Sequence, residues 1–514
     1  MRGHPFLKLL LIIALMAGLL GAAVRNTPLV EAVKNDDVAA VRALLQKGAN
    51  VNEPEVDGST ALHWAVYRND IEMVEILIKA QADARAVNRY HVAPLSLACV
   101  NGNPAIVKRL LTAGADPNTS MPGGETAVMT AARSGNPEVL KLLIAQGAEV
   151  NATETSKGQT ALMWAAAANN AGAIDVLVKA GANIKARSRP SPALSGSEPG
   201  DKGFTAFTFA ARAGNIEAAR TLLALGADVN ETLSDGTSAL VLATISARYE
   251  MAAFLLDNGA DANTAAQGWT ALHQIVYTRR PSRGLNTVGP VARGRVDSIS
   301  LVRKLIAKGA NINARVTKEM SSLYSGRNTL DRIGATPFFL AASRVDVELM
   351  KELLAHGADP TIPNEKGTTP LMVAAGVGLY SPGETPGTAE EAGVAVKLCL
   401  EHGNDPNVVD ANGDTALLGA AFRGSPSAVL ALVAAGARID AKNDITPMHR
   451  SSGAKATTGW NALMIADGIF LNAIFKSEPE TAALLRRLMK ERGISTDYVL
   501  EGQSAASEER TPPK

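Results

Sequence analysis

Histidine, cysteine and arginine are the residues of this chain that could do chemistry, so their spacing is considered first. The 514 residues include seven His and two Cys. The sequence has no His-Glu-x-x-His, Cys-x-x-Cys, Gly-x-Ser-x-Gly or phosphate-loop lysine motif, which are the spacings of metal, redox, nucleophile and nucleotide sites. Gly376 and Gly378 lack the third glycine, strand and helix of a nucleotide fingerprint. We therefore expect no catalytic residue, no metal and no cofactor.

Five arginines without any acidic residue form a local basic segment: Arg279, Arg280, Arg283, Arg293 and Arg295. Two interpretations stay open, an anionic partner such as a phosphate-rich or acidic surface and a solvated flexible loop. The whole chain is nearly neutral, with 51 Lys plus Arg and 50 Asp plus Glu. This balance gives no electrostatic reason to expect general nucleic-acid binding.

The elements that must position these side chains follow from a phrase that recurs about every 33 residues. Each copy has a hydroxyl residue, then Ala or Pro, then a leucine-rich run ending in Ala, as in Thr60-Ala-Leu-His-Trp-Ala. The twelve copies begin at positions 27, 60, 93, 126, 160, 205, 238, 270, 336, 369, 415 and 461. Two leucine-like residues followed by Gly-Ala-Asp, Gly-Ala-Asn or a close variant come after eleven of them, with one Gly replaced by Gln81.

Each copy predicts two short helices and a turn. The threonine hydroxyl can cap the first helix, and Pro suits its first turn. Val41, Leu44 and Leu45 show the i, i+3, i+4 spacing of one apolar helix face. Ala93 replaces the capping residue in the third copy, so we expect its first helix to fray. One copy cannot bury its apolar faces alone, whereas stacked copies can.

The threonine phrase and its period resemble the ankyrin repeat, over about residues 26 to 495. This resemblance implies an all-α solenoid of helix-turn-helix repeats with hairpin fingers. It also implies that His63 and His273 bind backbone groups and tie neighbouring fingers together. Trp64 and Trp164 lie inside the apolar run and are expected in the core. Cys99 and Cys399 belong to the third and tenth copies, too far apart for a disulfide, and are expected to be buried.

The predicted organisation is a signal peptide at 1–23, a solenoid of about twelve repeats at 24–498 and a disordered tail at 499–514. Extra residues must loop out near 188–202, 279–296, 316–333, 377–391 and 444–458. The leader has basic residues, an apolar run and a small-residue cleavage site. We expect a periplasmic or secreted protein without a membrane span in the mature chain; an uncleaved N-terminal anchor is the alternative.

The resemblance implies that a protein partner binds the concave face, which consists of fingertips and the solvent-facing ends of the first helices. Those ends lie seven and eight residues after the capping position. In six repeats they hold Arg or an aromatic residue: Tyr67, Arg68, Arg133, Arg212, Tyr277, Arg344, Phe422 and Arg423. Directly before the capping position, three fingertips hold aromatics that we expect to be exposed: Phe204, Trp269 and Trp460.

The function predicted from these observations is a non-catalytic protein-binding scaffold, a monomer, that acts outside the cytoplasm. One alternative is an enzyme or enzyme subunit whose site is built by the insertions between 279 and 391. Another is a secreted effector that targets host proteins.

Overall fold

The computed structural model describes residues 27–190, 203–281, 290–319, 330–379, 386–443, 459–468 and 477–498. These residues form two compact units, Met1–Ser234 and Asp235–Lys514, in the sense that contacts are concentrated within each. The predicted leader and tail lie outside the described residues, as does most of the 188–202 and 444–458 insertions. The regular secondary structure of the described residues consists of helices and isolated bridges, without strands, so the predicted all-α class is confirmed.

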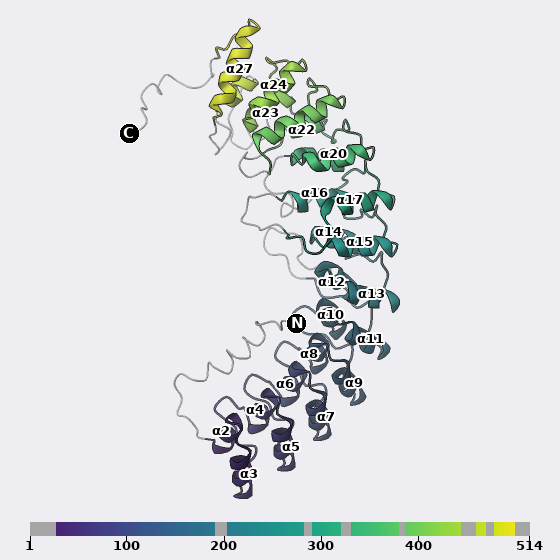
Figure 1. Cartoon of the computed structure of the whole chain (residues 1–514), viewed down its shortest axis with the longest axis vertical. Coiled ribbons are helices and arrows are strands. Elements are labelled where there is room, and N and C mark those ends of the chain that lie inside the picture. The colour runs from purple at the N-terminus through teal and green to yellow at the C-terminus, as the bar shows by residue number, and fades with distance from the viewer. Residues whose placement is uncertain are drawn as a thin grey trace, which may run out of the picture. The chain divides into compact units, whose positions relative to one another are not determined.

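The first unit consists of six helix pairs, and Figure 1 shows their members following one another along the stack. The first helix of each pair lies in one row: α2 Pro28–Lys34, α4 Ala61–Tyr67, α6 Pro94–Asn101, α8 Ala127–Ser134, α10 Ala161–Ala167 and α12 Ala206–Ala213. The second helices form the adjacent row: α3 Val38–Gln46, α5 Ile71–Lys79, α7 Pro104–Thr112, α9 Pro137–Ala145, α11 Ala171–Lys179 and α13 Ile216–Ala224. Each first helix packs on the next first helix and on its own partner.

The second unit repeats this plan with six more pairs. Its first helices are α14 Ala239–Ile245, α16 Ala271–Arg279, α19 Pro337–Ser343, α21 Pro370–Ala375, α23 Ala416–Arg423 and α26 Ala462–Ala466. Its second helices are α15 Tyr249–Asp257, α17 Ser298–Ala307, α20 Val347–Ala355, α22 Ala389–Glu401, α24 Pro426–Ala434 and α27 Pro479–Glu491. The described residues thus contain twelve pairs, each starting just after one of the twelve phrase positions.

One predicted loop is partly helical. The insertion at 377–391 was expected to loop out entirely, but α22 starts at Ala389 and has 13 residues. Thr388 caps it, and the Glu391 side chain returns to the Thr388 amide at 2.9 Å. This capping box favours an added helical turn over a loop, so the last residues of the insertion lengthen the second helix.

The caps and finger contacts follow the predicted chemistry. The Thr126 hydroxyl accepts a hydrogen bond from the Met129 amide, whereas Ala93 offers no side-chain cap. In the first unit His63 bonds the Thr60 amide through Nδ1 at 3.1 Å, and its Nε2 lies 3.0 Å from the Val92 carbonyl of the next finger. The predicted structural role of His63 is confirmed.

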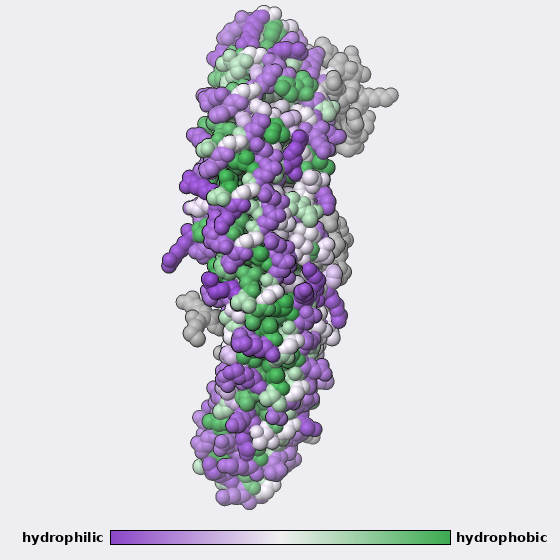
Figure 2. All heavy atoms as spheres, turned by 90° about the vertical axis from the view of Figure 1, so that its right-hand side faces the viewer, coloured by the Kyte–Doolittle hydropathy of each residue, from purple (hydrophilic) through white to green (hydrophobic). Residues whose placement is uncertain are grey.

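The second helices present a mixed surface. Figure 2 shows second helices, with hydrophobic residues between polar residues on their outer surface. The large apolar side chains that are well exposed are single ones on separate elements, such as Ile71, Val394 and Leu430. Single exposed apolar residues are normal for a folded surface. A binding site is therefore better sought on the first helices and fingers.

Candidate functional site

The ends of the first helices in the first unit carry four predicted partner-binding residues that face solvent. Tyr67 at the end of α4 is 40% exposed. The next residue, Arg68, caps the helix, donates to the Lys34 carbonyl at 3.0 Å and pairs with Asp36 at 3.3 Å. Arg133 on α8 and Arg212 on α12 are also accessible. The first unit thus presents these side chains on three first helices.

Cations at these helix ends stack on aromatic rings. Arg133 lies 4.6 Å from the ring centre of Trp164, which belongs to the next first helix. Its Nη2 also donates to Glu125 of its own finger at 3.0 Å. Lys34 repeats the arrangement, 4.6 Å from the Trp64 ring and paired with the finger residue Glu55. Such stacking and pairing fix long side chains before a partner arrives, which lowers the entropy lost on binding.

The prediction that Trp64 and Trp164 are core residues is therefore wrong. Both are half-buried, because one ring face lies under a cation from the preceding repeat. Arg212 makes a related contact within its own repeat, 4.4 Å from the Phe204 ring and 5.2 Å from that of Phe209.

The expected exposure of the three fingertip aromatics is wrong. Phe204, Trp269 and Trp460 are only 6%, 9% and 9% exposed. Two of them close fingers that contain insertions. The Ser188 amide donates to the Phe204 carbonyl at 2.9 Å, and the Asn443 amide to the Trp460 carbonyl at 3.1 Å.

Trp269 is covered from the next finger. There the Thr317 amide donates to the Gly268 carbonyl at 2.9 Å, the same contact between neighbouring fingers that the Thr155 amide makes with the Gly123 carbonyl. The position directly before the cap is also buried in shorter fingers, as for Ser59 and Thr368 at 3% each, so it can be enclosed without an insertion.

The corresponding helix ends in the second unit are also buried, against expectation. Tyr277, Arg344 and Arg423 are 5%, 3% and 5% exposed. The Arg344 guanidinium lies 4.8 Å from the centre of the Tyr277 ring, so these two buried side chains form a cation–π contact. Arg423 donates from Nε to the Ala375 carbonyl at 3.3 Å, and burial lowers its pKa to about 10. Their burial removes these three from a surface that a partner could touch directly.

The basic segment is anchored by its first two arginines. Arg279 pairs with Asp346 at 2.7 Å and with Glu348 at 2.7 Å. Arg280 forms two parallel hydrogen bonds with Glu391, at 3.0 and 2.8 Å. These partners lie 67 to 111 residues further along the chain. Arg279 and Arg280 therefore join repeats, while Arg293 and Arg295 are exposed and Arg283 lies outside the described residues.

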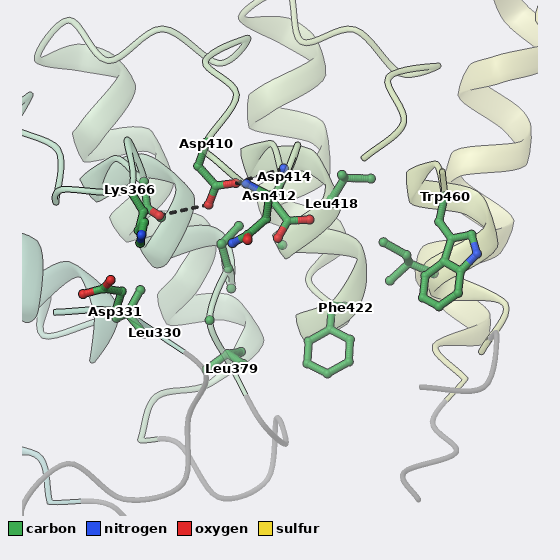
Figure 3. Close-up of a pocket in the computed structure, with 16 residues that line it drawn as sticks. Leu330, Asp331, Lys366, Leu379, Asp410, Asn412, Asp414, Leu418, Phe422 and Trp460 are labelled. Atoms are coloured by element: carbon green, nitrogen blue, oxygen red, sulfur yellow. Dashed lines mark hydrogen bonds between the residues drawn. The ribbon is translucent and has the colours of Figure 1, made fainter. Parts of the chain in front are cut away.

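A pocket of about 210 Å³ lies among the fingers and first helices of the second unit. Its walls include apolar side chains from three repeats: Leu379, Leu418, Phe422, Trp460 and Ile465. Figure 3 shows Phe422 and Leu379 on one side, Asp410 and Asp414 on the other, and Trp460 at one end. Of the predicted partner-binding residues, this pocket brings together Phe422 and Trp460.

The two aspartates make this pocket electrostatically unusual. Asp410 accepts hydrogen bonds from the Thr368 hydroxyl at 2.9 Å and from the Asn412 and Asp414 amides at 2.9 and 3.1 Å. Asp414 accepts one from Asn443 Nδ2 at 3.0 Å. Burial, aided by the nearby Asp410 charge, raises the pKa of Asp414 to about 6. Burial also raises the pKa of Asp410.

Sequence reasoning missed this acidic pair. Asp414 stands directly before the capping Thr415, in the position that Trp269 and Trp460 occupy in their repeats. That position was considered only for aromatic residues, although a carboxylate there would have been an equally visible signal.

A second cavity, of about 520 Å³ in the first unit, is a weaker candidate. It is lined by small and aliphatic residues such as Ala84, Ala115 and Leu95, together with a few polar ones, and by no aromatic residue. Its Arg85 already donates to the Gly114 carbonyl at 2.6 Å. The cavity therefore lacks the combination of aromatic walls and unpaired charge found in the second unit.

Both cysteines are buried free thiols, as predicted, and burial raises the pKa of each to about 12. Over the described ranges, no cluster of three or more His, Cys, Asp and Glu side chains is arranged to hold a metal ion. In the same part of the chain, none of the helices has the length and apolar character needed to cross a membrane.

Comparison with known proteins agrees with the repeat architecture. A profile described as ankyrin repeats (3 copies) matches residues 2–88, 95–188 and 193–266. Two related profiles, ankyrin repeats (many copies) and ankyrin repeat, match residues 395–433 and 333–365.

Curated relatives share different portions of the chain. The ankyrin repeat protein YahD of Escherichia coli (strain K12) is 31% identical over 191 residues, which are 33% of this chain and 87% of YahD. The human 2-5A-dependent ribonuclease is 39% identical over 79 residues, 15% of this chain and only 11% of that enzyme.

Among solved structures, the crystal structure of the human ASB11 ankyrin repeat domain has 24% identity and a TM-score of 0.36. The match covers 42% of this chain and 92% of that domain.

Proposed function

The chain belongs to the ankyrin repeat family, a class of protein-interaction scaffolds, and from this premise we propose that it binds a partner protein without catalysis, outside the cytoplasm. The observation that carries the proposal is the row of Tyr67, Arg68, Arg133 and Arg212 in the first unit. Tyrosine and arginine are enriched among residues that dominate binding energy. Arg133 and Arg212 are held by aromatic rings, so they are preorganised for a partner's carboxylates.

The experiment is affinity capture with residues 24–514 as bait, from periplasmic and secreted extract of the source organism. A second bait carries Arg133→Ala and Arg212→Ala. A matched control bait carries Arg42→Ala and Arg220→Ala, two arginines with exposed side chains on second helices of the same unit. We expect one protein to be captured by the unmodified and control baits and lost from the second bait. Equal capture by all three baits would contradict binding through the first-helix ends.

Thermal unfolding of the three baits separates binding from folding. Arg133 and Arg212 make surface contacts, so their removal should change the melting temperature no more than the control changes do. A clear fall in the melting temperature of the Arg133→Ala, Arg212→Ala bait alone would make these residues structural.

Export is proposed from the leader at 1–23, and its test is direct. The mature chain should start at Val24 and be recovered from the periplasm or medium. Full-length chain that stays with the membrane fraction would instead support the N-terminal anchor.

The second candidate function, an enzyme whose site is built by the insertions between 279 and 391, draws on one observation: Leu330 and Leu379 of these insertions line the pocket together with Asp414. A carboxyl group with a pKa of about 6, such as Asp414, could act as a general acid. However, Asp410 is already occupied by three hydrogen bonds, including two from backbone amides of its own turn. We therefore assign the pocket to binding. Turnover of any substrate that is lost in Asp414→Asn, while binding is retained, would reverse this assignment.

A further inference from the structure

The pocket of the second unit has the size and walls for an extended apolar stem. Its volume of about 210 Å³ is many times the roughly 10–15 Å³ that one water molecule needs. Phe422, Leu379 and Leu418 line it with apolar surface that aliphatic carbons can cover (Figure 3). Binding there would remove apolar area from water on both sides of the contact.

The polar side of the pocket is acidic and lacks a counter-ion. Asp410 is 7% exposed, and Asp414 is half-buried. Within the described residues neither carboxylate forms an ion pair. Their hydrogen bonds come from neutral donors, namely Thr368, Asn443 and backbone amides. Two buried like charges without a cation are unfavourable, so a bound cation would relieve the repulsion and replace the lost hydration.

The free acceptor sites favour a point-like cation over a planar one. Both oxygens of Asp410 already accept hydrogen bonds, and Oδ1 of Asp414 accepts from Asn443. Oδ2 of Asp414 receives none from the described residues. No carboxylate therefore presents two free oxygens for a bidentate guanidinium, whereas an ammonium can use one.

We propose that this pocket binds the side chain of a lysine from the partner protein, with its ammonium at Asp414 and its methylene stem against Phe422, Leu379 and Leu418. That the lysine belongs to a partner protein depends on the proposed scaffold function. The preference of the pocket for an alkylammonium group is independent of that function, because it follows from the pocket's own side chains.

The remaining charged residues around the pocket do not supply this cation. Asp331 and Lys366 also line it, and Lys366 is exposed with no ion pair to Asp410 or Asp414. Lys366 is a competing ammonium of the same chemistry. Its replacement in Lys366→Gln should therefore strengthen binding of an added amine.

The test uses the full chain and small probes that carry only the group in question. n-Butylammonium reproduces the lysine side chain, n-butanol is its neutral counterpart, and methylguanidinium represents arginine. Saturation-transfer NMR measures binding of each. We expect n-butylammonium to bind more tightly than both others. Equal or tighter binding of n-butanol would overturn the cation site, and tighter binding of methylguanidinium would overturn the choice of lysine.

Two variants assign the binding to Asp414. Asp414→Asn should weaken n-butylammonium at least about tenfold, because the ammonium loses its charged partner. The control is Glu138→Gln, since Glu138 is a carboxylate on α9 of the first unit whose side chain is 63% exposed and pairs with Lys141. It should leave the amine affinity unchanged. Unchanged affinity in Asp414→Asn would contradict the proposal.

The pH dependence gives an independent readout. A bound cation holds Asp414 ionised, while the free pocket takes up a proton near pH 6. The amine should therefore bind about tenfold more weakly at about pH 5 than at about pH 7.5. The same shift in Asp414→Asn would show that another group is responsible.

A peptide-binding experiment distinguishes failure of the lysine site from failure of the scaffold proposal. A capped Gly-Lys-Gly peptide should bind like n-butylammonium if the pocket accepts a lysine within a chain. Peptide failure with amine success would restrict the pocket to free amines and overturn its use by a protein. Failure to capture any partner with the full bait, while amine and peptide still bind, would contradict the scaffold proposal and leave the pocket assignment intact.

Discussion

Arg279 Nε lies 2.7 Å from Oδ2 of Asp346, a residue 67 positions further along the chain. The Asp346 side chain is 1% exposed, and a second hydrogen bond, from Arg279 Nη2 to Oδ1 at 3.0 Å, completes a bidentate pair. Arginine at the end of α16 therefore holds the first turn of α20 in the next repeat. What the sequence presents as the start of a basic loop is an internal connection.

Loss of this pair should destabilise the second unit. Arg279→Ala leaves Asp346 buried without its cation, so we expect the free energy of unfolding to fall by about 3 kcal/mol. Native-state hydrogen exchange in α16 and α20 measures the change. Arg303→Ala is the control, because Arg303 pairs with Glu352 from a side chain that is 61% exposed. A comparable loss in both variants would contradict a special role for Arg279.

Acid should weaken the contact made by His273. Its Nδ1 accepts from the Thr270 amide at 3.0 Å, its Nε2 lies 3.0 Å from the Ala314 carbonyl, and burial lowers its pKa to about 4. Between the unfolded value of 6.5 and this value, only the unfolded chain takes up the proton. The free energy of unfolding should therefore fall by about 3 kcal/mol as pH falls through this window.

The difference between wild type and His273→Ala isolates this effect. The variant should be less stable at neutral pH and lose less stability on acidification. His91→Asn is the control, since His91 is exposed on a finger with a positive φ of 57°, which asparagine tolerates. An identical acid response in wild type and His273→Ala would exclude His273 as its source.

The features that sequence predicted well depend on neighbours within one repeat or at one period. The Thr126 cap, the His63 bridge to the next finger and the helix pairs follow from local hydrogen bonds and spacing. The burial of Trp269 and the pairing of Arg279 depend on contacts with the next finger and with the start of the next second helix. No pattern within one repeat encodes how these partners meet, so exposed aromatics were predicted and a solvated basic loop was left open as one interpretation.

The enclosure of the acidic pocket could not be predicted for the same reason, although the Asp414 carboxylate itself is visible in the sequence. Burial and the nearby Asp410 charge raise the pKa of Asp414, and Trp460 and Leu379 from other repeats line the same pocket. Each of these residues is unremarkable in its own repeat. Their combination depends on stacking three repeats in register.

The missing cap of the third repeat gives a prediction of increased stability. Ala93→Thr supplies a hydroxyl to the Ser96 amide at the start of α6, as Thr126 does for α8. We expect a gain of about 1 kcal/mol in the free energy of unfolding. Urea unfolding followed by hydrogen exchange in α6 measures it. Ala93→Val, which adds a similar volume without the hydroxyl, should give no gain; a gain in both variants would attribute the effect to packing.

The two cysteines provide one reporter for each unit. Cys99 and Cys399 are both fully enclosed, and burial raises the pKa of each thiol to about 12, so neither should react in the native state. A thiol reagent added at increasing urea should label Cys99 when the first unit opens and Cys399 when the second does. Arg279→Ala should advance only the labelling of Cys399. Rapid labelling of either thiol without denaturant would contradict its burial.

Asp414 should lower the stability of the fold while serving the pocket. Its pKa is about 6 in the folded chain and 3.8 when unperturbed, so the folded state holds the proton more tightly. The free energy of unfolding should fall as pH rises from the lower to the higher value, and Asp414→Asn should remove this fall. Asparagine keeps an oxygen for Asn443, so we expect the variant to be about 2 kcal/mol more stable than wild type above pH 6. Urea unfolding of both proteins at several pH values measures the difference.

The Asp414→Asn variant should also bind n-butylammonium poorly, so that stability is gained while binding is lost, as is common at binding sites. A variant less stable than wild type at neutral pH would show that the carboxylate supports the fold and would remove the strain on which the pocket's affinity for a cation depends.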